Sequence, residues 1–271
     1  MENKIQGTGL PLILPVSILP VSIFTGLVLI LIVFVSGCTP LRPQTDPGLD
    51  TKARFIANEI LSLNQEITSS KGTGWAELKT DTRGAKFKIA WAASAPNRLR
   101  ITFLVSGHPV ETIVATGENV IFISHTGEHT SHTTFSSDPD LEKYLHVPIK
   151  LSNMITILLG HIPIKKFDHA WFEPGKNNSA PIILAQNWKS SFQKLHLDTV
   201  GQVQQLVFLD RDNTPLYDIT YLDYQAHGQS RIPGTLLIKD GAGRSIRLTF
   251  TRFIPNPPIK ESVFRLTESG S

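Results

Sequence analysis

Alternation of apolar and polar residues is the feature that most restricts the fold of this chain. Residues 87–91 and 99–105 carry apolar side chains at every second position, and eight later stretches behave in the same way. Turn-forming sequences separate these stretches, as at residues 95–97 and 240–243. A period of two is typical of strands in a half-buried sheet. About ten to eleven short strands without long crossover helices predict a mainly β fold, in which one antiparallel sheet curls towards a barrel.

Two segments follow a helical period instead. Four aliphatic residues recur at spacings of four, three and four, which predicts an N-terminal helix that starts near residue 50, ends near residue 70 and has one apolar face: Ile56, Ile60, Leu63 and Ile67. A strongly apolar helix is predicted at residues 151–159, just before Gly160, and a short one after Pro139. In an otherwise all-β chain, the apolar helix is expected to be a lid or a plug.

Composition and motifs exclude several classes of function. The net charge is +3 and the basic residues are scattered, which does not favour a nucleic-acid-binding protein. A single cysteine excludes an internal disulfide framework and a multi-cysteine metal site. The sequence contains neither a Gly-x-Ser-x-Gly nucleophile motif nor a glycine-rich phosphate loop. We therefore expect neither a catalytic site nor a cofactor.

Three histidines lie close together and allow two interpretations. His125, His129 and His132 have spacings of four and three, which could present metal ligands from a helix. The threonine, glycine and serine residues around them are typical of a strand-turn-strand segment instead. We expect a solvated hairpin turn and no metal, and a zinc or copper site is the alternative.

The N-terminal segment has the pattern of an export signal. Residues 6–41 contain no charged residue, Lys4 precedes them, and residues 21–35 form an apolar run of signal-peptide length. The run ends at Val35-Ser36-Gly37-Cys38, which resembles the lipobox of bacterial lipoprotein precursors. The resemblance implies a signal peptide at residues 1–37 and lipid attachment at Cys38, with several acyl chains giving a stable anchor. Two alternatives are a permanent membrane helix within residues 10–36 and an unmodified Cys38.

Residues 38–50 are then expected to form the lipidated cysteine and a proline-rich tether, and residues 51–271 the folded domain. Thr39, rather than aspartate, follows the cysteine. By analogy with the sorting rule of enterobacterial lipoproteins, this favours an outer-membrane location over an inner-membrane one, with the domain facing the periplasm.

The order of motifs along the chain resembles that of the LolA/LolB family, and of the LolB-type outer-membrane lipoprotein receptors in particular. After the lipobox and the N-terminal helix come Gly72-Thr73-Gly74-Trp75-Ala76, the stretch at residues 87–91, and Arg98-Leu99-Arg100. A central segment follows with Pro148, Leu151, Leu158, Leu159, Gly160 and Pro163, and residues 234–250 resemble the last strands of that family. The resemblance covers almost all of the chain after Cys38 and implies that residues 51–271 are a LolA/LolB-like lipid-binding domain.

This resemblance implies a half-open antiparallel barrel with an apolar cavity. In the family, the cavity takes the acyl chains of lipoproteins that a LolA-like periplasmic carrier delivers, and the receptor inserts them into the outer membrane. The residues expected to line an acyl-chain pocket are Trp75, Phe87, Ile89, Trp91, Leu99, Ile101, Phe103, Met154, Ile155 and Leu158. The alternative is that these side chains fill an ordinary closed core.

One departure from the family concerns a loop that delivers cargo to the membrane. LolB proteins carry an exposed leucine there, whereas the matching loop here contains Val105, Gly107, His108 and Val110. This departure leaves two functions open. The first is a LolB-like lipid and lipoprotein receptor. The second is an envelope lipoprotein that uses the same curved sheet as a scaffold for a protein partner, with a filled core and an exposed patch or sheet edge.

Overall fold

The computed structural model describes residues 47–80, 82–127, 131–173, 180–187, 190–228 and 230–265. The predicted signal peptide, Cys38 and most of the predicted tether lie outside the described residues. Residues Thr45–Ser271 form one compact unit, and all described core residues lie within it. Residues 47–50, which we assigned to the tether, are already helical in this unit.

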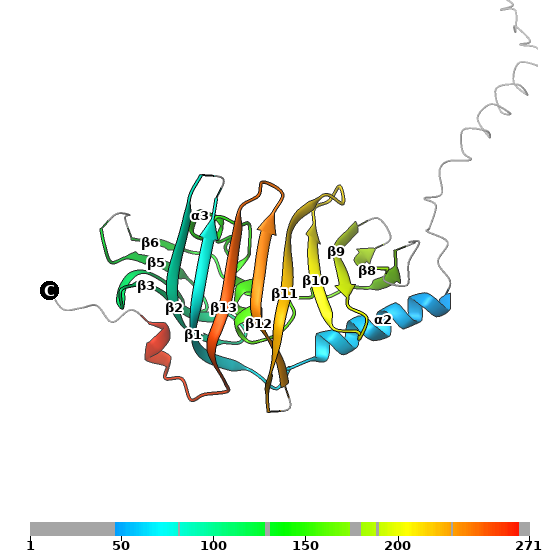
Figure 1. Cartoon of the computed structure of the whole chain (residues 1–271), viewed down its shortest axis with the longest axis horizontal. Coiled ribbons are helices and arrows are strands. Elements are labelled where there is room, and N and C mark those ends of the chain that lie inside the picture. Colours follow the sequence, from blue (N-terminus) through cyan, green and yellow to red (C-terminus); the bar gives the residue numbers. More distant parts are fainter. Residues whose placement is uncertain are drawn as a thin grey trace, which may run out of the picture. The chain divides into compact units, whose positions relative to one another are not determined.

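One antiparallel sheet of thirteen strands forms the body of this unit (Figure 1). The first six strands are β1 (Ser69–Lys79), β2 (Gly84–Ser94), β3 (Arg98–Val105), β4 (His108–Ala115), β5 (Val120–Ser124) and β6 (His132–Thr134). The other seven are β7 (His169–Phe172), β8 (Ile182–Asn187), β9 (Ser190–Leu197), β10 (Val203–Leu209), β11 (Pro215–His227), β12 (Ser230–Asp240) and β13 (Ser245–Pro255).

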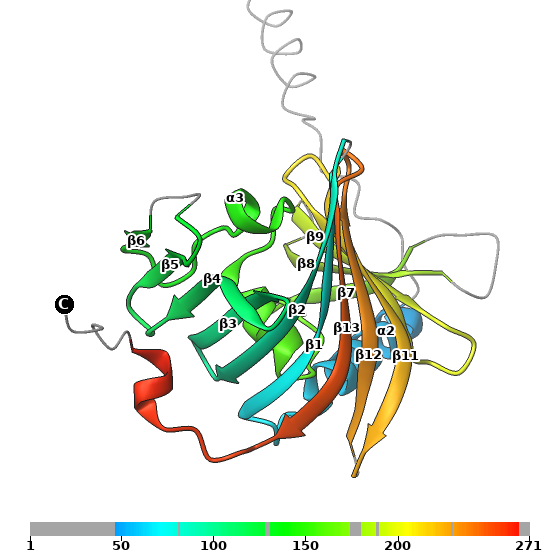
Figure 2. The ribbon, with the colours of Figure 1, turned by 60° about the vertical axis from the view of Figure 1, so that its left-hand side comes forward.

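The strand order shows that the sheet is continuous through its centre and ends in two edge strands. It runs β6-β5-β4-β3-β2-β1-β13-β12-β11-β10-β9-β8-β7, so the first and last strands of the chain pair with each other. The two edges are β6 and β7, with three and four residues. Neither strand is among the stretches in which alternation was recognised, because so few residues cannot display an alternation. The open, curved sheet agrees with a half-open barrel (Figure 2).

The N-terminal helix differs from the prediction at its C-terminal end. Helix α2 spans Pro47–Ser62 and stops well before residue 70. Asn64 takes a left-handed conformation with a φ of 61°, which ends the helix, and its side-chain amide donates hydrogen bonds to the carbonyls of Gly160 and Arg231. The buried face of α2 is therefore Ala53, Ala57 and Ile60. Leu63 is exposed, and Ile67 enters the core from the segment that follows the helix.

The crossover from β6 to β7 carries two short helices on the concave side of the sheet (Figures 1 and 2). Helix α3 spans Glu142–Leu145 and α4 spans Leu151–Leu158. Helix α4 is buried on nearly every side, and Gly160, with a φ of 79°, follows it as predicted. Asp138 accepts hydrogen bonds from the backbone N–H and the hydroxyl of Ser152 in the first turn of α4. Helix α4 is therefore a plug of the sheet rather than a lid over an empty cavity.

Small residues on β1 make room for large ones on β2. Gly72 lies opposite Trp91, and a Cβ at Gly72 would come within 2.2 Å of the indole ring. The buried Trp91 indole N–H donates to the Ser70 hydroxyl, which donates to the carbonyl of Leu158 in α4. The Gly-x-Gly motif of β1 thus serves packing: Gly74 faces the carbonyl of Thr249 on β13 at a distance that leaves no room for a Cβ.

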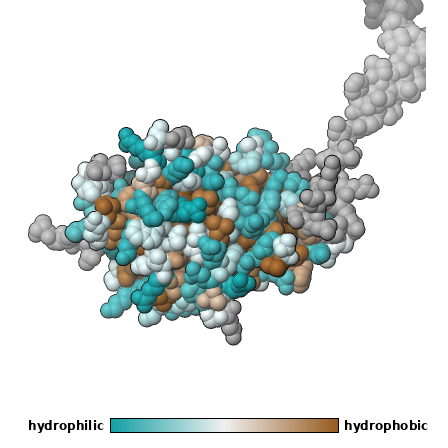
Figure 3. Space-filling model, in the orientation of Figure 1, coloured by the Kyte–Doolittle hydropathy of each residue, from teal (hydrophilic) through white to brown (hydrophobic). Residues whose placement is uncertain are grey.

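The outer face of the sheet differs from the concave one. In the orientation of Figure 1, this face is a mixture of hydrophilic and apolar residues with the apolar ones in scattered groups (Figure 3). The last element, the 3-10 helix η1 (Glu261–Phe264), contacts β3, and Arg98 forms an ion pair with Glu261 at 3.0 Å. The main hydrophobic core lies on the concave side, and a smaller buried cluster of Trp171, Ile183 and Ala185 on β7 and β8 is separate from it.

Candidate functional site

A cleft of about 950 Å³ lies at one end of the concave face, between the ends of the first strands and helix α3. Its volume falls within the range of known small-molecule sites, about 300–1,000 Å³. The residues that line it are Leu78, Thr80, Arg83, Gly84, Ala85, Phe87, Phe103, Val105, Val110, Glu111, Thr126, His132, Lys143, Tyr144 and His146.

Apolar side chains of β2, β3 and β4 form the sheet wall of this cleft. Phe87 and Phe103 meet edge to face, with ring centroids 5.9 Å apart. Ile89 pairs with Phe103 in the register of β2 and β3, so the cleft begins where the filled core ends. Val105 and Val110 extend the apolar wall to the solvent, and Val105 is 46% exposed. This wall can hold an apolar ligand without hydrogen bonds.

The predicted membrane-delivery loop lies beside the cleft. Residues 106 and 107 form the β3–β4 turn, and both have a positive φ, which is typical of a tight hairpin turn. Gly107 and His108 are exposed, and Val105 and Val110 on either side line the cleft. The loop thus combines an exposed tip with an apolar base that continues into the cleft.

Helix α3 and strand β6 form the opposite wall. The ring of Tyr144 stacks on Phe122 at a centroid distance of 3.6 Å, and its hydroxyl is hydrogen-bonded to the ring of His132. His146 ends α3 in a left-handed conformation with a φ of 60°. Lys143 and His146 are exposed at the solvent side of this wall. The second wall is therefore aromatic inside and cationic outside.

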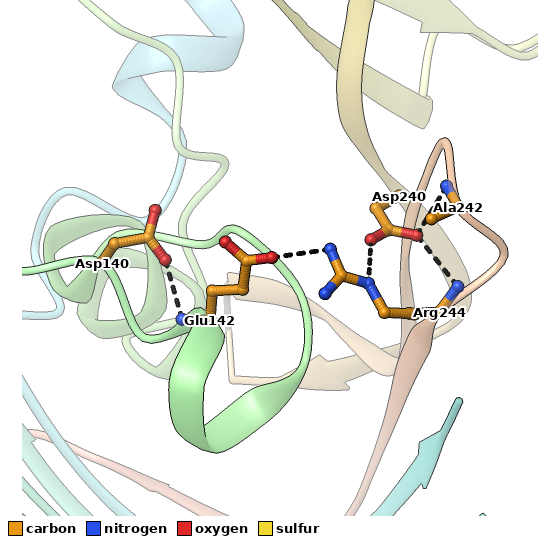
Figure 4. A network of polar contacts seen from close by, with 5 residues as sticks. All are labelled: Asp140, Glu142, Asp240, Ala242 and Arg244. Carbon is orange, nitrogen blue, oxygen red and sulfur yellow. Dashed lines mark hydrogen bonds and ion pairs between the residues drawn. The ribbon is translucent and has the colours of Figure 1, made fainter. Parts of the chain in front are cut away.

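A network of polar contacts holds α3 in this position (Figure 4). Arg244, at the start of the β13 side of the β12–β13 hairpin, forms ion pairs with Glu142 at 2.7 Å and with Asp240 at 2.6 Å. The hydrogen bond to Glu142, followed by the one to Asp240, raises the pKa of Arg244 above its ordinary value. Asp140 accepts a hydrogen bond from the backbone N–H of Glu142 at the start of α3. The carboxylate of Glu142 is thus turned to the hairpin, while its neighbour Lys143 lines the cleft.

The ten residues predicted for the acyl-chain pocket fall into three groups. Phe87 and Phe103 line the cleft. Seven others are buried in the core and do not line it: Ile89, Trp91, Leu99, Ile101, Met154, Ile155 and Leu158. Trp75 was placed on the wrong face: the alternation of β1 turns it outwards, where it is 40% exposed and lies beneath the ammonium of Lys86 at 5.3 Å.

Several lining residues were not predicted from the sequence. Arg83, Lys143 and His146 come from a hairpin and a short helix, where no periodic pattern marks the side that faces a cleft. Tyr144 follows the short helix start after Pro139, which the sequence does indicate, but its contact with β5 depends on the crossover. Such contacts between distant segments leave no local signal.

The histidine segment adopts the expected strand-turn-strand arrangement in its described part. His125 follows β5 and accepts or donates a hydrogen bond with the Thr112 hydroxyl at 2.9 Å, and His132 begins β6. His129 lies outside the described residues. Within the described ranges, no group of three or more potential ligands is arranged to hold a metal ion. The same part of the chain contains no helix of the length and apolar character needed to cross a membrane.

Comparisons with known proteins find similarity in structure and not in sequence. No model of a protein family matches the chain, and no curated protein matches it. A domain from Vibrio parahaemolyticus described as an outer membrane lipoprotein-sorting protein matches with a TM-score of 0.55 and 13% identity, covering 79% of this chain and 96% of that one. A LolA superfamily protein from Nitrosomonas europaea matches with a TM-score of 0.53 and 9% identity, covering 79% and 97%.

A DUF1329 family protein from Desulfovibrio piger matches with a TM-score of 0.57 and 6% identity, over 80% of this chain and 97% of that one. Identities this low establish a common fold alone. All three likenesses extend over most of this chain and almost the full length of the matched chains. The chain therefore has the LolA/LolB-type fold, a strongly curved antiparallel sheet with helices on its concave side.

Proposed function

We propose that this protein is a membrane-anchored lipoprotein that binds acyl chains in the cleft between the β2–β4 strand ends and helix α3. The observation that carries the proposal is the position of an apolar-walled cleft of about 950 Å³ in a LolA/LolB-type fold. Two of the similar structures are described by names that refer to lipoprotein sorting or to LolA. We therefore propose lipoproteins as the cargo and a LolA-like periplasmic carrier as the donor.

Binding and release in such a cleft need no covalent chemistry. Each methylene group transferred from water to an apolar wall contributes about 0.8 kcal/mol. A partly covered acyl chain therefore gains part of this binding free energy. The cleft is open to solvent along its charged side, where Arg83, Lys143 and His146 are exposed. Partial cover limits the affinity, which a protein that passes its cargo on requires.

The membrane anchor and the delivery loop complete the proposal. Cys38 would carry the lipid anchor in the outer membrane, with the domain on the periplasmic side. The β3–β4 loop at Gly107 and His108 would approach the bilayer, and Val105 and Val110 would replace the leucine of LolB proteins as the apolar contacts. Their place on the cleft wall supports this role, because cargo leaving the cleft would pass them.

A pair of matched substitutions tests the binding site. Val105 and Leu216 are both 46% exposed, and only Val105 lines the cleft. The full chain in lipid nanodiscs is given a fluorescent triacylated peptide, and its binding is followed by fluorescence anisotropy. Val105→Asp is expected to weaken binding about tenfold or more, because a carboxylate on the wall opposes an apolar ligand. Leu216→Asp is expected to leave binding unchanged.

The scaffold function remains the alternative, and one observation favours it. Within the part of the chain that the structure describes, the centre of the concave face is filled by the buried side chains of α4. If the unmodified chain does not bind the acylated peptide, or if both substitutions weaken binding equally, the cleft proposal is wrong and the scaffold is preferred.

A further inference from the structure

Two cations of the cleft lining, Arg83 and Lys143, lie on opposite walls. Within the described residues, neither Arg83 nor Lys143 forms an ion pair. By contrast, Lys86 pairs with Glu77 at 2.7 Å, and Arg244 pairs with two carboxylates. Lys143 also lies over the ring of Tyr144, with its ammonium 5.8 Å from the ring centroid, and both cationic side chains are exposed at the cleft.

The charges around the cleft are arranged by depth. Arg83, on the β1–β2 hairpin, and Lys143, on α3, are both exposed. Phe87 is half-buried and Phe103 is buried on the inner wall between them. A ligand with an apolar chain and a charged end would place the chain on the aromatic wall and the charged end near the solvent. The cleft therefore has the layout of a site for an amphiphile.

The sign of this charge favours an anionic head group. Arg83 and Lys143 contribute two positive charges, and the exposed His146 adds an imidazole that can donate a hydrogen bond, whereas the ring of His132 is hydrogen-bonded to the Tyr144 hydroxyl. The carboxylate of Glu111 is the one acidic group of the lining, and it lies half-buried on β4, opposite Phe103. Phosphate and carboxylate groups are the usual partners of arginine and lysine side chains.

We infer that the cleft selects acyl-chain ligands with an anionic head group, held between Arg83 and Lys143. This inference rests on the acyl-chain binding of the proposed function, and it adds to lipoproteins a second class of ligand for the same cleft. A fatty acid and an anionic phospholipid share the required chemistry, namely an acyl chain with an oxyanion at one end. The contact between Glu142 and Arg244 supports the selection, because it turns the carboxylate next to Lys143 in sequence towards the β12–β13 hairpin (Figure 4).

The test uses the full chain in nanodiscs of zwitterionic phosphatidylcholine. Three photoreactive probes carry the same diazirine acyl chain: a phosphatidylglycerol, a phosphatidylcholine and a free fatty acid. Cross-links to residues of the cleft are quantified by mass spectrometry. We expect one or both anionic probes to label the cleft about tenfold more than the phosphatidylcholine, since a hydrogen bond to a charged group is worth about a factor of ten. Which anionic probe labels identifies the source of the ligand.

Two double variants separate the local effect from the net charge. Arg83→Gln with Lys143→Gln is expected to reduce anionic labelling to the zwitterionic level. Arg252→Gln with Lys239→Gln removes the same charge from exposed positions away from the cleft and is expected to keep the preference. All four residues are exposed, so the variants are expected to fold, and circular dichroism checks this.

The outcomes distinguish the inference from the proposed function. Equal labelling of the cleft by all three probes, or a preference that survives the loss of Arg83 and Lys143, overturns the inference and leaves acyl-chain binding intact. Absence of cleft labelling with every probe overturns both. A preference that also weakens with added salt, as exposed charges are screened, supports the electrostatic origin.

Discussion

The centre and the end of the concave face are built from the same kind of strands, yet one is filled and the other is open. At the centre, α4 presents apolar side chains on almost every side and is buried among the strands. At the end, α3 presents Lys143, Tyr144 and His146 to a cleft. The strands of both regions alternate in the same way, so the difference arises from the crossover helices. Alternation makes a concave apolar face, and the crossover decides which part of it remains accessible.

The comparison also explains why so many predicted pocket residues lie in the core. Ile101, Phe103 and Val105 follow one another on the inner face of β3, and their exposure rises along the strand towards the cleft. Ile101 is buried in the filled core, whereas Val105 lies outside the core and lines the cleft. One strand therefore contributes to both regions.

The largest expected effect comes from removing a buried side chain of α4. Leu158 in α4 is fully buried, and Leu158→Ala is expected to lower the free energy of unfolding by about 2–5 kcal/mol, because it removes contacts and leaves a cavity. Leu63→Ala, at an exposed position, is expected to change it by about 0.5 kcal/mol or less. Urea denaturation measures both. If the two variants are equally stable, α4 does not fill the centre.

Two glycines on neighbouring strands, one in the filled core and one in the cleft wall, are expected to differ in their tolerance of a larger side chain. A Cβ at Gly72 would approach the Trp91 ring at 2.2 Å and the Arg252 carbonyl at 2.4 Å, so Gly72→Ala is expected to destabilise the fold by about 1–3 kcal/mol. At Gly84, in the cleft wall, the nearest atom would be 3.8 Å away, so Gly84→Ala is expected to be nearly neutral. Thermal unfolding compares them, and an equal loss would contradict the packing described for β1 and β2.

The pH dependence of stability tests whether His161, which follows α4 and Gly160, is buried in the folded protein. Burial lowers the pKa of His161 below its ordinary value, although its hydrogen bond with the Asn64 carbonyl opposes this shift. The unfolded chain therefore binds the proton first as the pH falls. Stability is at its full value above the ordinary histidine pKa of about 6.5 and is lost as the pH falls towards the folded pKa.

His161→Gln is expected to flatten this slope between about pH 5 and 7, as measured by urea denaturation at several pH values. Burial also lowers the pKa of His196 on β9, so His196→Gln is expected to reduce the slope of stability against pH as well. An unchanged slope in both variants would mean that neither histidine is buried in the folded state.

The smallest expected effect on stability comes from Arg244, whose ion pairs hold α3 beside the cleft. Arg244→Gln removes the ion pairs with Glu142 and Asp240 and is expected to lower stability only slightly, because exposed ion pairs contribute little. It should raise hydrogen exchange locally, in residues 140–147. Arg265→Gln breaks an exposed ion pair with Glu261 and serves as the control. Equal exchange around α3 in both variants would show that Arg244 does not position the second wall.

The sequence predicted the parts of the fold that depend on local patterns. The alternation identified ten of the thirteen strands, the Gly-x-Gly motif lies on β1, and the apolar run before Gly160 identified α4. Edge strand β7 and the end of α2 at Asn64 were missed, since four residues carry no period and one left-handed residue can stop a helix. Edge strand β6 was indicated only by the turn residues of the histidine segment.

The candidate site was predicted less well than the fold, for a physical reason. Alternation distinguishes the two faces of a strand, but it cannot tell whether an inward side chain meets α4 or an open cleft. Phe87 and Phe103 were therefore predicted together with Trp91 and Ile155, although only the first two line the cleft. The exposed cations Arg83 and Lys143 are brought to the cleft by the hairpin and the crossover, which no local pattern encodes.

The most direct test of the account is to locate a bound acyl chain by NMR. The full chain, labelled at its isoleucine, leucine and valine methyl groups, is studied in nanodiscs with a fatty acid that carries a spin label near the end of its chain. We predict the strongest broadening at the methyl groups of Leu78, Val105 and Val110, which line the cleft. Strongest broadening at Leu151, Ile155 and Leu158 would contradict the account, because the chain would then displace α4 and occupy the centre of the sheet.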